Sequence, residues 1–196
     1  EFLSSMKLYA SDYSEKTALR SGNSERVVAI MIIISALLVL GIAIFSYLLD
    51  KSAFKNYLFG GLLILAAGIF FLFTSKAIYL WFDFTIVNTM LEGISAMAYL
   101  LFAFVLIKNL FRGKVEKAGG IITLLYGVFT SSLIAVSLFS EIYFYNLKGV
   151  WTVGAVAFSI AFMVLSLISL KGSSRKVKIE LIFSIIGILV VWLDIV

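Results

Sequence analysis

Two carboxylates interrupt the apolar stretches of this chain, and they are its strongest candidates for chemistry. Glu92 lies eight residues after Phe84, where its stretch begins, which places it about 12 Å inside a helix that rises about 1.5 Å per residue. Asp194 lies about 20 Å along the last stretch. Acids inside a membrane span are costly and are functional candidates by default. Together with Asn88, one turn before Glu92, they form a candidate intramembrane polar site for sensing or for binding an ion.

A simpler interpretation stays open for both acids. Glu92 would then bond to a serine, a threonine or a backbone carbonyl, and Asp194 would mark the polar end of its helix. The spans contain no Lys or Arg that could pair with either carboxylate, which argues against a buried ion pair.

Most other chemistry is excluded by composition, because the chain contains no Cys, no His and no Pro. Without Cys or His there is no disulfide, no thiolate or imidazole metal site, no haem ligand of these types and no catalytic triad built on them. Glycine-rich phosphate-binding motifs are absent as well. We therefore expect no catalytic residue, no metal site and no cofactor.

The elements that position these residues are predicted to be transmembrane helices. Hydrophobic residues make up 62% of the 196-residue chain and charged residues 14%, and the mean hydropathy is +1.11. A soluble domain contains about 45–50% apolar and about 25% charged residues. We therefore expect a multi-pass protein of the cell membrane, with lipids as partners and no nucleic acid.

Six apolar stretches approach the length of about 20 residues that a membrane crossing requires. Residues 1–26 precede them as an extracytoplasmic polar tail or the stub of a larger domain. The predicted fold class is an all-α membrane protein, a polytopic bundle of six helices over about 27–49, 57–75, 84–107, 118–139, 150–170 and 181–196.

Positive charge predicts the orientation of the bundle. The connections after the first, third and fifth stretches carry ten basic residues, whereas the alternate connections carry only Lys76 and Lys148. Because cytoplasmic loops are enriched in Lys and Arg, the first set is predicted to be cytoplasmic and the N-terminus outside. Six spans then also end outside, so we expect a seventh helix after Val196. Binding of anionic lipids is a second use for the same charges.

Aromatic residues gather near the predicted outer ends of the helices, where an aromatic belt is expected. Anchoring at the interface is the simpler interpretation, and an outward-facing pocket for a small ligand is the alternative. The belt comprises Tyr79, Trp81, Tyr143, Tyr145, Trp151 and Trp192.

Small residues recur at four-residue spacing in the fourth stretch. This pattern predicts a helix-packing seam, in which small side chains let two backbones approach closely. Its partner helix lies either in the same subunit, or in a homodimer partner or another membrane subunit. The seam comprises Gly119, Thr123, Gly127, Ser131 and Ala135.

Three segments carry a resemblance to a known family. They are KLYASDYSEKTAL before the first stretch, KNYLFGGLLILAAGIFFLFTSKAIYL in the second, and SLISLKGSSRKVKIELIFSIIGILVVWLDIV at the end. This layout resembles the seven-helix membrane sensor regions of bacterial receptors with diverse intracellular signalling modules, of the type that precedes GGDEF diguanylate cyclase domains. The resemblance implies a bacterial plasma membrane, a seventh helix and an output domain that carries all of the catalysis.

The expected function is therefore that of a non-catalytic sensor or signal-transmission region. It would pass an extracellular or intramembrane stimulus to a cytoplasmic output domain by shifting between two packings of the bundle. Two alternatives stay open, a structural subunit of a membrane complex and a small transporter or channel. The latter is disfavoured because no internal repeat or broken helix is visible.

Single introduced cysteines test the predicted orientation, because the chain has none of its own. A membrane-impermeant maleimide is expected to label Tyr145→Cys in intact cells and to label Lys114→Cys only after the membrane is opened. External labelling at position 114 together with protection at position 145 would reverse the predicted topology.

Overall fold

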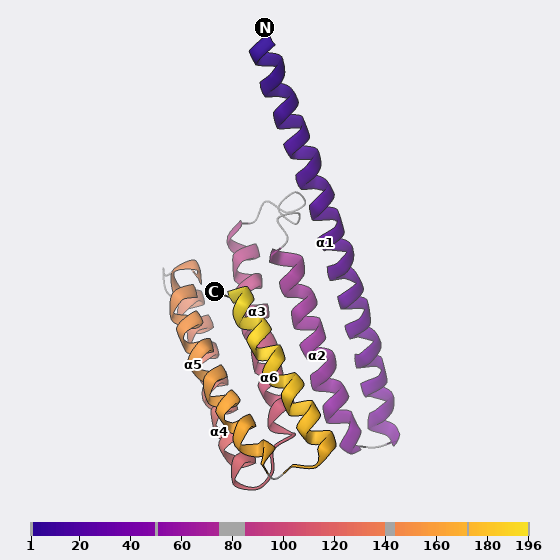
Figure 1. Ribbon diagram of the computed structural model, residues 1–196, viewed down its shortest axis with the longest axis vertical. Coiled ribbons are helices and arrows are strands. Elements are labelled where there is room, and N and C mark those ends of the chain that lie inside the picture. Colours follow the sequence, from indigo (N-terminus) through magenta and orange to yellow (C-terminus); the bar gives the residue numbers. More distant parts are fainter. Residues whose placement is uncertain (1, 50, 75–84, 140–143, 172, 196) are drawn as a thin grey trace.

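The computed structural model describes residues 2–49, 51–74, 85–139, 144–171 and 173–195, and it contains helices and turns but no strand within these ranges (Figure 1). This confirms the predicted all-α fold class. The helices are α1 (Phe2–Leu49), α2 (Lys51–Thr74), α3 (Thr85–Lys108), α4 (Lys114–Phe139), α5 (Phe144–Leu170) and α6 (Arg175–Ile195).

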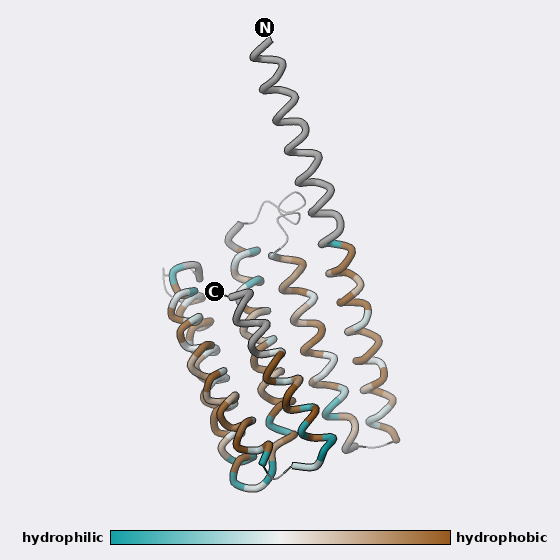
Figure 2. Tube along the Cα trace, viewed as in Figure 1, coloured by the Kyte–Doolittle hydropathy of each residue, from teal (hydrophilic) through white to brown (hydrophobic). Residues whose placement is uncertain are grey.

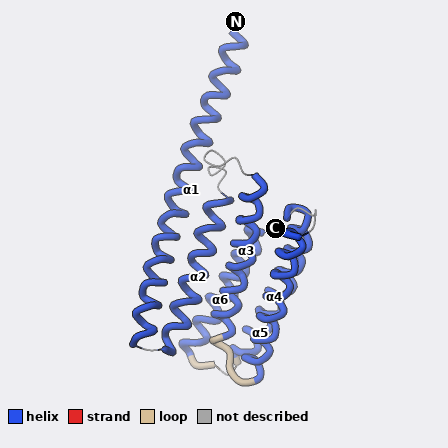
Figure 3. The backbone as a smooth tube through the Cα atoms, turned by 180° about the vertical axis from the view of Figure 1, so that it is seen from behind, coloured by secondary structure: helices blue, strands red, loops and turns tan. Residues whose placement is uncertain are grey.

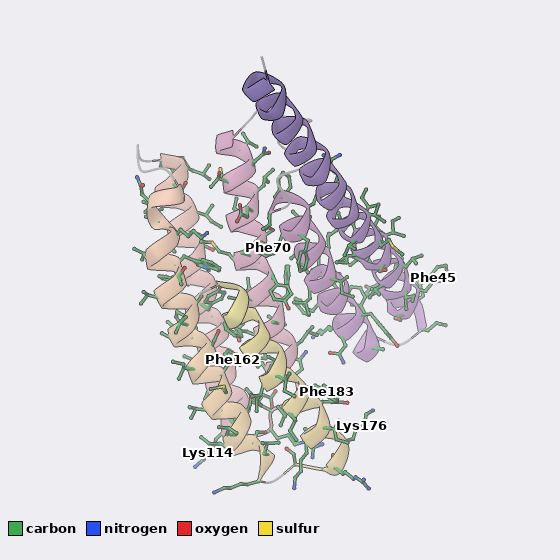
Figure 4. The ribbon with its side chains drawn as sticks, turned by 45° about the horizontal axis from the view of Figure 1, so that its top comes forward. Phe45, Phe70, Lys114, Phe162, Lys176 and Phe183 are labelled. Atoms are coloured by element: carbon green, nitrogen blue, oxygen red, sulfur yellow. The ribbon has the colours of Figure 1, made fainter. Side chains whose placement is uncertain are left out.

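Five of the described helices, α1 to α5, contain segments long and apolar enough to cross a membrane. Their apolar residues run the length of the bundle (Figure 2), and large side chains such as Phe45 and Phe183 are 71% and 68% exposed on its outside (Figure 4). Such a surface suits contact with lipid chains and would aggregate in water. The five helices therefore indicate a multi-pass membrane protein, and α6 occupies the sixth predicted stretch.

Besides α1, four helices begin earlier than the hydropathy pattern predicts, α5 at Phe144 and the other three at a basic residue. The first residues of α2, α4 and α6 are Lys51, Lys114 and Arg175, four to six residues before the apolar stretches. An apolar stretch marks the part of a helix that lies in hydrocarbon, whereas the backbone hydrogen bonds continue outside it. Lys and Arg are good helix formers, so the basic residue at the start of α2, α4 and α6 forms part of the first turn of each helix.

The predicted polar tail is also helical. α1 is a single helix of 48 residues that includes both the polar segment and the first span. At about 1.5 Å per residue it is roughly 70 Å long, and its N-terminal half extends beyond the bundle (Figure 1). The segment contains no Pro that would end the helix, and its Ala, Leu, Glu, Lys and Arg residues, interspersed with serines, favour helix.

The helices run alternately up and down in chain order. α1 packs on α2 and α2 on α3, while α3, α4 and α5 each contact the other two and α6 packs on α5. Seen from behind, the α3–α4 and α5–α6 connections lie together at one end of the bundle (Figure 3). α3 is therefore the helix that joins the α1–α2 pair to the α3–α4–α5 group.

Small residues bring α1 and α2 close together. A methyl group added at Gly61 would lie 2.7 Å from the Leu40 side chain, and one at Gly68 would lie 2.7 Å from Ile33. Such contacts are shorter than atoms tolerate, so only glycine fits at these two positions. The buried residues on the described part of α1 are alanines at seven-residue spacing, Ala29, Ala36 and Ala43.

Adjacent glycines on α2 allow a matched test of this contact. Gly61→Ala is expected to lower the free energy of unfolding by about 1–3 kcal/mol, because the methyl group overpacks against Leu40. Gly60→Ala meets nothing within 4 Å and should be neutral or stabilising by up to about 1 kcal/mol through helix propensity. Unfolding of the purified protein in mixed micelles measures both, and equal stability of the two variants would contradict a tight α1–α2 contact.

Candidate functional site

The polar residues of α3 gather on one face of the helix. Asn88, Glu92 and Ser95 follow one another at spacings of four and three residues, which brings them to the same side. Asn88 and Ser95 are buried, and Glu92 is half-buried. The structure therefore places two of the three predicted polar-site residues, Asn88 and Glu92, together on a face that is partly enclosed by the bundle.

Ser95 was not among the predicted site residues, although its spacing from Glu92 was readable in the sequence. Its hydroxyl donates to the backbone carbonyl oxygen of Glu92 at 2.8 Å. A serine hydroxyl has one proton, so this bond within the helix leaves it none for the Glu92 carboxylate. A local bond of this kind satisfies Ser95 without fixing where the carboxylate points.

The predicted partner of Glu92 is only partly described. Asp194 belongs to α6, but its side chain lies outside the described residues, so a shared site with Glu92 stays a prediction. The same holds for most of the aromatic belt. Among its members, Tyr79, Trp81 and Tyr143, and the side chains of Tyr145 and Trp192, lie outside the described part of the chain.

Trp151 requires a correction, because the structure does not place it as an interfacial anchor. Its side chain is 4% exposed and lies inside the group formed by α3, α4 and α5. The indole Nε1–H donates to the hydroxyl oxygen of Tyr126 at 3.3 Å, in a buried contact between α5 and α4. Trp151 therefore serves the core of the bundle, where its polar atom finds a partner.

The predicted seam on α4 packs inside the subunit only at its first residues, and a contact of the others with another subunit stays a prediction. Gly119 is buried, Thr123 and Gly127 are half-buried, and Ser131 and Ala135 are exposed. A four-residue step advances about 400° around a helix, so each step drifts about 40° and the fifth residue faces almost away from the first. A seven-residue step drifts only about 20°. The face that α4 buries accordingly follows the second spacing, with Gly119, Tyr126, Thr130 and Leu133.

The first residue of the seam, Gly119, makes a close contact within the chain. A methyl group at Gly119 would lie 2.8 Å from the ring of Phe111, whereas one at Gly127 would make an ordinary contact with Leu101 at 3.7 Å. The tightest glycine contact in this part of the bundle is instead Gly154 of α5, which lies directly against the ring of Phe129. The seam residue that matters for packing inside the subunit is therefore Gly119.

An aromatic cluster joins the three central helices. The ring of Phe162, labelled in Figure 4, stacks on that of Phe104 with centroids 4.2 Å apart and planes within 2° of parallel. Tyr126 meets Phe104 edge-on at 5.1 Å and Phe158 edge-on at 5.4 Å. Such ring pairs add about 0.5–1.5 kcal/mol each beyond the burial of their surface. This cluster links α3, α4 and α5, and its ring positions were hidden in the sequence among equally apolar neighbours.

The described side chains limit what this region does chemically. Within the described residues no three acids, histidines or cysteines gather to hold a metal ion, and Ser159 Oγ is the buried side-chain oxygen without a hydrogen-bond partner. The polar groups of this region are hydroxyls, an amide and one carboxylate, all of which form hydrogen bonds. Comparison of the chain with known protein families, curated proteins and solved structures finds no match.

The Trp151–Tyr126 hydrogen bond is open to direct measurement. Tyr126→Phe is expected to lower the free energy of unfolding by at least about 0.6 kcal/mol, the average for hydrogen bonds between membrane helices. The upper end is about 3 kcal/mol, because the indole N–H is left buried without an acceptor. Half-buried Tyr99 of α3 provides the control, since Tyr99→Phe breaks no comparable bond between helices.

A double-mutant cycle separates this bond from packing. In a Trp151→Phe background, Tyr126→Phe should cost less than it does alone, because the donor has already been removed. An equal cost in both backgrounds would show that the bond contributes nothing to stability.

Proposed function

We propose that the chain is the membrane sensor and signal-transmission region of a receptor. It receives an extracellular or intramembrane stimulus and passes it, through a change in helix packing, to a cytoplasmic output domain encoded beyond Val196. The single observation that carries this proposal is the continuity of α1 from Phe2 to Leu49. One helix connects the segment outside the bundle with the first membrane span.

The packing of α1 favours transmission of a movement. Its span contacts mainly α2, and the contact combines buried alanines of α1 with the Leu40 and Ile33 side chains, which lie against glycines of α2. Large side chains on the other faces of the span are exposed, so α2 is the main helix that holds α1 in register. Helix displacements of about 1–2 Å at such interfaces are a common switching movement. A stimulus that favours one of two packings of α1 on α2 would shift the population between them.

The route onward leads through α3. α2 contacts α3, and α3 carries both the polar face with Glu92 and the rings that stack in the core. An intramembrane stimulus that binds at Glu92 would therefore act on the same helix that α2 displaces. In this proposal, a movement of α1 and binding at Glu92 both act on α3. The signal then passes from α3 to the cytoplasmic ends of α4, α5 and α6.

The alternatives have less support. Transporters commonly use helices that are broken near the middle of the membrane. The five spans of the described chain are continuous helices, which disfavours that function. A structural subunit of a membrane complex would need no continuous α1, and the following experiment distinguishes it from a sensor.

Insertion of alanines between Asn23 and Ser24 tests transmission through α1 in the full-length protein. One added residue turns the outer part of the helix by about 100°, whereas seven restore its direction to within about 20°. The activity of the output domain encoded after Val196 is expected to change with one residue and to recover with seven. Output activity that is the same with one and with seven inserted residues would favour the structural subunit. A stop codon directly after Val196 would favour it as well.

A further inference from the structure

Ten of the sixteen basic residues of the chain belong to three connections at one end of the bundle, which we call the basic end. It consists of the connections 50–56, 108–117 and 171–180, with ten basic and three acidic residues and a net charge of +7. The whole chain carries +5, so the remainder is negative. A hydrogen bond of 3.2 Å from Asn109 to Asn56 joins the first two connections, and polar residues gather at this end in Figure 2.

The α3–α4 connection is held firmly by a buried ring. Phe111 is 2% exposed, its ring stacks on Phe162 at 6.0 Å, and its backbone N–H donates to the carbonyl of Lys108 at 3.0 Å. Two residues later Gly113 has a φ of +60°, which lets the chain turn sharply into α4. The turn is thus folded back under the bundle with a fixed shape.

Apolar anchors at this end direct the neighbouring basic side chains outward. Val115 and Val177 are half-buried and pack against the same core cluster, although they belong to different connections. Lys114 precedes the first anchor, and Lys176 and Lys178 flank the second, and all three are exposed. Figure 4 labels Lys114 and Lys176 at this end of the bundle. The α3–α4 turn and the start of α6 therefore form one surface, which we call the platform. Packing of Val115 and Val177 against the core leaves the neighbouring lysines exposed on this surface.

The depth of this platform favours a lipid over a soluble partner. The α3–α4 turn has five residues between its helices and the α5–α6 connection has four. Most of the charges consequently lie within about one or two helical turns of the apolar spans, a turn being about 5.4 Å. This is the level of the phosphate groups of a bilayer leaflet. Basic groups beside membrane spans are the usual site for anionic lipid headgroups.

We propose that the basic end binds anionic phospholipids through their phosphodiester groups and that bound lipid fastens α6 to the bundle. Lys and Arg donate charge-assisted hydrogen bonds to phosphate oxygens. α6 packs mainly on α5, so a phosphate shared by the α3–α4 turn and the start of α6 adds a polar connection to the apolar contact that Val177 makes with the core cluster. The site does not depend on which side of the membrane it faces or on the sensor function.

Lipid titration of the full chain in neutral detergent tests the proposal. The probes are phosphatidylglycerol, cardiolipin and zwitterionic phosphatidylcholine, and native mass spectrometry gives the apparent Kd while melting gives the stabilisation. Both anionic lipids are expected to bind and to raise Tm, and added salt should weaken them. The triple variant Arg112→Gln, Lys114→Gln, Lys117→Gln should bind the anionic lipids at least about tenfold more weakly, because each basic group near a membrane contributes measurably.

Two control variants separate charge from fold. Lys148→Gln removes an exposed charge outside the basic end and should leave binding unchanged. Arg112→Lys, Lys114→Arg, Lys117→Arg keeps the charge and should retain most of the affinity. The three substituted side chains are exposed, so the lipid-free Tm of the triple variant should match the parent. If it does not, Lys176→Gln with Lys178→Gln on the other connection replaces it, with the same expected loss of binding.

Three results would overturn the proposal. The first is equal affinity for phosphatidylglycerol and phosphatidylcholine. The second is unchanged anionic-lipid affinity in the neutralised variants. The third is binding of inorganic pyrophosphate without lipid, at similar affinity and with the same dependence on the triple variant, which would identify a free phosphate compound as the ligand.

Discussion

Helices within hydrocarbon gain little from burying apolar side chains against one another, because lipid chains are as apolar as leucine. Their association depends on how closely two surfaces fit. The chain meets this constraint in two different ways. Gly61 and Gly68 let the backbones of α1 and α2 approach until no added methyl group would fit. In the central group, rings such as Phe104 and Phe162 fill the space between helices that lie farther apart.

These two kinds of contact differ in what they allow. The α1–α2 contact depends on the fit of Leu40 and Ile33 against glycines, so a shift of one helix against the other has to move these two side chains. Stacked and edge-on rings interlock, and displacing one of them opens a void that the neighbours fill poorly. α3 takes part in both regions, and it also carries Asn88, Glu92 and Ser95 on its partly enclosed face. In the proposed sensor, α3 therefore connects the α1–α2 pair, which moves, to the packed group of α4 and α5, which stays in place.

The sequence was sufficient for the fold class and the apolar spans, because hydropathy over about 20 residues is a strong signal. The sequence was not sufficient to predict which face of each helix packs in the core and which contacts lipid. Residues that contact lipid are as apolar as those in the core, so the amphipathic periodicity of soluble helices is missing. The seven-residue repeat of Ala29, Ala36 and Ala43 was a readable signal, since its drift is small. The four-residue repeat from Gly119 to Ala135 drifts around α4, so only its first residues face the neighbouring helices of the same subunit.

The candidate site was predicted in part for the same reason. Asn88 and Glu92 stand out in an apolar helix, and the structure places them on one face. Trp151 could not be assigned from composition, because tryptophan suits both an interface and a core in which its N–H finds an acceptor. Only the position of Tyr126 on the neighbouring helix decides between them. The orientation of the bundle and a seventh helix stay predictions.

The buried ring of Phe111 also has a consequence for assembly during synthesis. Its contacts with Lys108 and Gly119 span fewer than ten residues of sequence, whereas its contact with Phe162 spans about fifty. Local contacts of low closure entropy form first, and the N-terminal part of a chain is made first. The α3–α4 hairpin is thus able to close around Phe111 before α5 has left the ribosome. The ring then presents a finished surface on which the last two helices dock in turn.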